Sequence, residues 1–215
     1  MEVANKILQM AGINNSARSY AWVDAAVMTL ITALSVYNGQ ASVFYIIYLF
    51  WWNEVITLVV GRVFDKIYKR EKFLSIGKER SSRFFLLGIY WVFILVFFGL
   101  MANWDNTEIM MINFSVLLFK NYFFLANLGF FILEQCKYNI QHKDEASQHS
   151  TFTTNMVVLH ISIVLGGLVI FFVVKKFPET FTPDNIWGSV LIIAPFLLLR
   201  FIIRLMYADG TDETR

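Results

Sequence analysis

The stretch of sequence that decides the fold runs from Ile109 to Glu134 and reads IMMINFSVLLFKNYFFLANLGFFILE. It is an apolar run with a polar residue at every seventh position, namely Asn113, Lys120, Asn127 and Glu134. Seven residues are nearly two helical turns, so these side chains form one stripe that drifts by about 20° per heptad. Such a helix is stable in a bilayer when its stripe faces protein, water or a substrate, so we predict that other helices cover it.

The composition of the whole chain is that of a membrane protein. Of its 215 residues, 57% are hydrophobic and 16% are charged, which is far more apolar than a globular domain. Six apolar runs approach the ~20 residues that cross a bilayer as a helix. We therefore predict an all-α polytopic membrane bundle in a single domain over residues 1–215. The expected transmembrane helices cover residues 20–36, 41–63, 84–100, 109–132, 155–174 and 186–206.

The basic residues predict the orientation of these helices. With six spans, fifteen of the eighteen Lys and Arg residues fall on one side, and the positive-inside rule makes that side cytoplasmic, with both termini inside. Residues 62–83 form the most basic loop. Its charges are typical of any cytoplasmic loop, and the alternative is a binding site for anionic lipids or a cytoplasmic protein partner. No motif supports nucleic-acid binding. The loop contains Arg62, Lys66, Lys69, Arg70, Lys72, Lys78, Arg80 and Arg83.

Charged and amide side chains inside the predicted spans are the candidate functional residues. Counting from the outer helix ends places Glu54 and Lys120 at nearly the same depth, so we predict that they form an ion pair. Nearer the cytoplasm we predict a second cluster, because an unpaired charge at such depth is costly. This cluster contains Asp24, Glu134, His160, Arg200 and Arg204, and the uncharged candidates are Asn53, Asn113 and Asn127.

Two functions are compatible with this pattern. The first is a small transporter or channel-like protein with a polar intramembrane cavity that opens toward the cytoplasm. The alternative is a non-catalytic membrane anchor or effector subunit, which oligomerises or docks a cytoplasmic partner through its basic loop. The stripe by itself does not separate them, because buried polar residues also fix helix register.

The sequence assigns no catalytic residue, cofactor or metal site. The dense motifs of membrane enzymes do not occur in it. One cluster resembles metal ligands, but its histidines are seven residues apart, which matches neither the HExxH pair nor zinc-ribbon spacing. We therefore predict a solvated loop at this cluster, which consists of His142, Asp144, Glu145 and His149.

The segment Phe50-Trp51-Trp52-Asn53-Glu54-Val55-Ile56 carries a family resemblance. It resembles the aromatic Trp-x-Glu-Asn helix of a group of uncharacterised bacterial multi-pass membrane proteins. Trp52 and Glu54 match that pattern, whereas Val55 stands where the pattern has Asn. The resemblance covers this one helix. It implies a bacterial inner-membrane protein and no particular activity.

Overall fold

The structure is a computed structural model, and it describes residues 26–68, 76–141, 153–182 and 185–210, with the backbone alone for 76–80 and 204–210. These residues form helices and no strand. A helix over Ala26–Tyr37 comes first. It is followed by α2 (Val43–Ile67), α3 (Ile76–Phe93) with its π-helical and 3-10 continuations η1 (Ile94–Leu100) and η2 (Met101–Asn103), α4 (Thr107–Leu117), α5 (Tyr122–Gln141), α6 (Thr154–Leu168) with its π-helical end η3 (Val169–Val174), and α7 (Ile186–Gly210).

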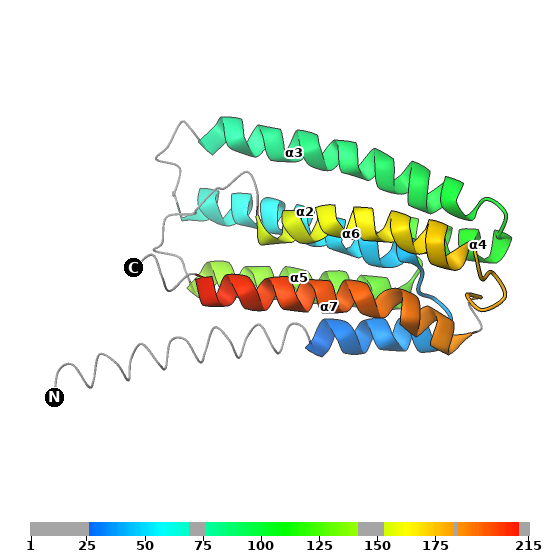
Figure 1. Cartoon of the computed structure of the whole chain (residues 1–215). Coiled ribbons are helices and arrows are strands. Elements are labelled where there is room, and N and C mark those ends of the chain that lie inside the picture. Colours follow the sequence, from blue (N-terminus) through cyan, green and yellow to red (C-terminus); the bar gives the residue numbers. More distant parts are fainter. Residues whose placement is uncertain (1–25, 69–75, 142–152, 183–184, 211–215) are drawn as a thin grey trace.

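Five helical stretches are long and apolar enough to cross a membrane. The chain is therefore a helical, multi-pass membrane protein, as the composition predicts. In Figure 1 these helices lie roughly side by side, with α3 along one edge and the helix Ala26–Tyr37 along another. The stretches are Val43–Ile67, Ser81–Asn103, Thr107–Gln141, Thr154–Val174 and Ile186–Ile203, and the helix Ala26–Tyr37 is a shorter apolar one.

The helix at the centre of the bundle is α2, which contacts α3, α4, α5, α6 and α7. Every residue from Val43 to Phe50 is buried. Because this run is longer than two helical turns, α2 is covered on all sides in this half. The centre of the fold is therefore α2, and not the stretch from Ile109 to Glu134 from which the fold was predicted.

The predicted helix over residues 109–132 is in fact two helices. α4 ends at Leu117, and Phe119 has a left-handed backbone with φ 57°. The amides of Phe119 and Lys120 bond back to the carbonyls of Val116 and Ser115, at 3.1 and 2.8 Å. This is a Schellman motif, with Phe at the position where Gly is usual.

Asn121 closes the break and locates it along the bundle. Its Oδ1 accepts from the Phe124 amide at 2.9 Å and so caps α5, while its Nδ2 donates to the Gln40 carbonyl at 3.0 Å. Gln40 lies in the turn before α2, so the break is level with that turn. We call this the turn end of the bundle (residues 38–42, 101–106 and 118–121). Hence, of these two helices, only α5 runs through the bundle. Figure 1 shows α4 at the turn end.

Gly166 sets the distance between α6 and the centre of the bundle. A Cβ at this position would lie 2.5 Å from Ile47 Cδ1 and 2.8 Å from Phe98 Cε1. A side chain here would have to displace Ile47 or Phe98, so the glycine lets α6 cross close to α2 and η1, in agreement with the close packing that small residues allow between membrane helices.

Candidate functional site

Glu54 is buried at the junction of α2, α3 and α6. One of its carboxylate oxygens forms an ion pair with Arg83 of α3, and the other accepts a hydrogen bond from Thr153 Oγ1 at 2.9 Å. Glu54 is 0% exposed and Arg83 is 5% exposed. Thr153 also caps α6, because its hydroxyl oxygen accepts from the Met156 amide at 3.2 Å. One carboxylate therefore joins three helices.

This arrangement corrects two predictions. Glu54 pairs with Arg83 instead of Lys120, and Arg83 is not part of an exposed basic loop. Lys120 is exposed and lies in the break between α4 and α5, next to Asn121. The depth count failed because it assumed one continuous helix. Once the chain turns at Phe119, Lys120 lies at the turn end, and Glu54 lies deep in the bundle beside the first residues of α6.

Asn113 and Asn127, the amides of the predicted stripe, bond to neighbouring helices. Asn113 Nδ2 donates to the carbonyls of Phe98 and Gly99 in η1, at 3.3 and 3.2 Å, and its Oδ1 accepts from Ser42 Oγ at 2.7 Å. Asn127 Nδ2 donates to the Tyr45 hydroxyl at 3.0 Å. Both side-chain amides thus connect α2 or its N-cap residue to a neighbouring helix. Asn53, the third predicted amide, is buried in α2 beside Glu54.

Glu134 of α5 and Arg200 of α7, two members of the predicted inner cluster, attract one another electrostatically. The Arg200 guanidinium also lies over two rings, 4.7 Å from the centroid of Phe131 and 5.6 Å from that of Phe50. Such cation–π contacts stabilise a buried guanidinium. Through these two rings, Arg200 of α7 contacts both α2 and α5.

His160 does not belong to this cluster. It is exposed on α6, and its Nδ1 lies 2.8 Å from the Tyr90 hydroxyl of α3. The remaining candidates fall outside what the structure describes: Asp24, the side chain of Arg204, Lys69, Arg70, Lys72, the side chains of Lys78 and Arg80, and the loop cluster His142, Asp144, Glu145 and His149. Within the described residues, no group of three or more His, Cys, Asp or Glu side chains is placed to hold a metal ion.

A buried group of oxygens between the helix Ala26–Tyr37, α2 and α5 was not predicted as a site. Thr32, Ser35, Tyr45 and Asn127 are all 0% exposed, and the hydroxyls of Thr32 and Ser35 lie beside that of Tyr45. Their orientations nevertheless leave Thr32 Oγ1, Ser35 Oγ and Asn127 Oδ1 without a hydrogen-bond partner among the described residues. Thr32 and Ser35 are small hydroxyl residues three apart in the sequence, whereas Tyr45 lies in an apolar run and has the sequence context of a core residue.

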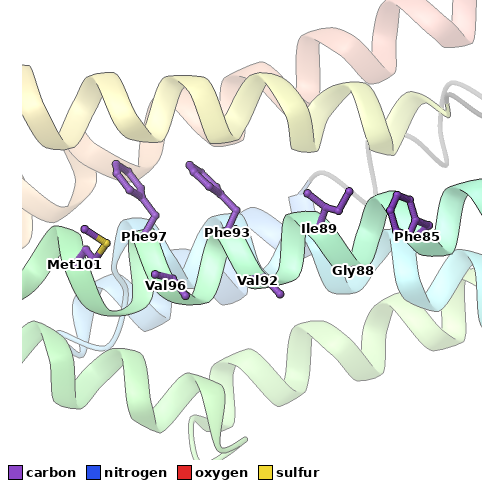
Figure 2. A pocket seen from close by; sticks show the side chains of 8 residues that line it. All are labelled: Phe85, Gly88, Ile89, Val92, Phe93, Val96, Phe97 and Met101. Atoms are coloured by element: carbon purple, nitrogen blue, oxygen red, sulfur yellow. The ribbon is translucent and has the colours of Figure 1, made fainter.

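A shallow groove of about 750 Å³ runs along the outward face of α3 and its continuations (Figure 2). Two neighbouring helical rows line it, each with residues four apart. The large row contains Phe85, Ile89, Phe93, Phe97 and Met101, and the small row contains Gly88, Val92 and Val96. In Figure 2, Phe93 and Phe97 point toward the side on which α6 lies.

The fold and these contacts define a multi-pass helical membrane protein in which the buried carboxylate of Glu54 is paired with Arg83. Comparisons with protein-family models, with curated proteins and with solved structures find no match.

Proposed function

We propose that this protein is a non-catalytic membrane anchor or effector subunit, a bundle that holds a docking surface at the membrane. The observation that carries the proposal is the burial and hydrogen bonding of the two amide side chains in the polar stripe. Asn113 and Asn127, which a conduction path would expose to water, are 2% and 0% exposed and bonded across helix seams. Polar groups that bond between helices stabilise a fixed assembly.

In this proposal the chain has six spans, with the turn end outside and both termini in the cytoplasm. Arg62 and Lys66 are exposed at the end of α2 opposite the turn end, and Lys137 is exposed near the end of α5. These charges favour a cytoplasmic face that contacts anionic lipids or a cytoplasmic protein partner. The resemblance of the Trp52 and Glu54 segment supports a bacterial inner membrane as the location. Reporter fusions after Gly39, Trp104 and Thr182 should report outside, and fusions after Ser75 and Ala146 should report inside.

The accessibility of single cysteines tests the proposed function. In a Cys136→Ser background, cysteines at positions 113 and 127 should stay unreactive toward small membrane-impermeant thiol reagents added from either side. A cysteine at position 120 should react from outside, because Lys120 is exposed at the turn end. Reaction at both 113 and 127 in folded protein would show a solvated path and overturn the anchor proposal.

A transporter or channel-like protein is the second candidate. The specific observation in its favour is the group of unpartnered oxygens at Thr32, Ser35 and Asn127. Buried polar atoms without partners are costly in a membrane, and bound water or a passing polar solute would satisfy them. This candidate predicts that a cysteine at position 32 or 127 reacts from one side and that reconstituted protein conducts a solute across vesicles.

A further inference from the structure

Four aromatic side chains that carry an N–H or O–H group are exposed beside the turn end of the bundle. Each belongs to a different element and lies at or next to the end of that element. Trp187, Tyr122 and Trp104 are the three most exposed of the large apolar side chains that the structure describes, at 82%, 81% and 73%, and Tyr37 is 70% exposed. We call them the aromatic belt, which consists of Tyr37 at the end of the first described helix, Trp104 after η2, Tyr122 in α5 and Trp187 in α7.

The helix ends that carry the aromatic belt lie at one level of the bundle. The Asn121 side chain joins the start of α5 to Gln40, in the turn after the first described helix. A small cavity of about 40 Å³ lies between the other ends, because it is lined by Ser42, Asn103 and Ser189, which belong to the start of α2, the end of η2 and the first turn of α7. In Figure 1 the end of the first described helix (blue) and the start of α7 (orange) accordingly lie at the same end of the bundle as α4.

The polar atoms of the aromatic belt are available to a partner outside the protein. Within the described part of the chain, no hydrogen bond is found for the hydroxyls of Tyr37 and Tyr122 or for the indole N–H groups of Trp104 and Trp187. In hydrocarbon these polar atoms would lose all hydrogen bonding, and in bulk water the rings would stay hydrated. A layer of lipid headgroups fits both halves of each side chain, because it receives the apolar ring and offers oxygen acceptors to the N–H or O–H group.

We propose that the aromatic belt lies in the layer of lipid headgroups on the turn-end side of the membrane and holds the bundle at that depth. The indole N–H and phenol O–H groups donate to ester carbonyl and phosphate oxygens of the lipids, and the rings lie against the upper part of the acyl chains. Charge begins at the same level, because Val174 lines the small cavity and is followed by the exposed Lys175 and Lys176. The belt goes beyond the proposed anchor role, since it would serve a transporter equally well and does not depend on which side of the membrane the turn end faces.

Nitroxide spin labels on single cysteines test the depth of the belt. In a Cys136→Ser background, Tyr122→Cys, Trp187→Cys and Val92→Cys are labelled and reconstituted into phosphatidylcholine vesicles, and depth is measured from the accessibility of each label to oxygen and to a nickel chelate. Val92 is the control, because it is exposed but lies eleven residues from either end of the span Ser81–Asn103. The labels at positions 122 and 187 should lie in the headgroup layer, and the label at position 92 about 10 Å or more deeper. Belt labels as deep as the control, or in bulk water, would overturn the proposal.

Matched double variants test whether the belt holds the bundle in place. Tyr122→Ala combined with Trp187→Ala should shift the label at position 92 by about 3 Å relative to the headgroups, because displacement against the bilayer is opposed only weakly once interfacial anchors are lost. Leu133→Ala combined with Leu198→Ala changes the same two helices at side chains that are 70% and 59% exposed and have no polar atom, so it should leave the depth unchanged. Circular dichroism should show that both variants remain helical. Equal shifts for the two double variants, or no shift for either, would contradict the holding role of the belt.

Discussion

The Asn121 side chain donates to the Gln40 carbonyl at 3.0 Å and thereby joins two helix ends that lie far apart in the sequence. Gln40 follows Gly39, whose φ of 64° ends the helix Ala26–Tyr37 in a Schellman motif like the one at Phe119. The bond holds the turn before α2 against the start of α5, at the point where the polar stripe is interrupted.

Asn121→Ala should therefore destabilise the turn end. It removes the cap on the Phe124 amide and the bond to Gln40, which together are worth about 2–3 kcal/mol. Thermal unfolding in detergent should show a clear fall in Tm. Asn38→Ala is the control, because the Asn38 amide bonds the Leu34 carbonyl at an exposed position within one turn. Equal shifts for both variants would argue against the junction.

Replacing Arg83 should be far more damaging than replacing Lys120. Arg83→Met leaves the buried Glu54 carboxylate without its cation, which costs about 3–5 kcal/mol in comparable pairs. Lys120→Met changes an exposed side chain and should shift stability by no more than about 0.5 kcal/mol. Chemical denaturation of the folded protein measures both. Adding Glu54→Gln to Arg83→Met should restore part of the loss, since the charge is then gone. A larger loss for Lys120→Met would contradict the observed pairing.

Gly166 and Gly167 are neighbours in α6 with opposite surroundings, so they make a matched pair. Gly166→Ala places a methyl group against Ile47 and Phe98, both of which are buried, and should cost about 1–3 kcal/mol. Gly167→Ala meets nothing within 4 Å and should be neutral or stabilising by up to about 1 kcal/mol, the helix preference of Ala over Gly. Melting curves of the two variants, recorded side by side, decide the matter. A loss of stability in Gly167→Ala comparable to that in Gly166→Ala would argue against the close crossing.

Thr32 and Thr57 test whether the buried oxygens are dry. Thr32 Oγ1 has no hydrogen-bond partner among the described residues, so Thr32→Val should raise the free energy of unfolding, because it removes an unsatisfied buried hydroxyl of the same shape. The Thr57 hydroxyl donates to the Asn53 carbonyl at 2.9 Å and accepts from Asn155 Nδ2 at 3.4 Å. Thr57→Val should therefore lower the free energy of unfolding. Destabilisation by Thr32→Val would mean that this hydroxyl is hydrogen-bonded, either to the Tyr45 hydroxyl beside it or to bound water, and bound water would favour the transporter.

The membrane class and the approximate positions of several helices could be read from the sequence. Expected spans over residues 84–100, 155–174 and 186–206 each lie within an apolar helix or helical stretch of the structure. Insertion depends on apolar character summed over about twenty neighbouring residues, which is a local property of the chain. The sequence also placed Glu134 and Arg200 together in one predicted inner cluster, because an unpaired charge at that depth is costly.

The partners of the remaining polar residues were decided by the tertiary structure. Neither glycine nor proline marks the break at Phe119 in the sequence. The break is accompanied by a bond from Asn121 to Gln40, which lies in a turn far away in the sequence. Because of that break, Lys120 lies at the turn end. The buried carboxylate of Glu54 is neutralised by Arg83 instead. Which charges meet depends on how each helix is rotated and which neighbour it packs against, and these are properties of the assembled bundle. Counting residues along one helix gives neither the rotation of that helix nor the neighbour against which it packs.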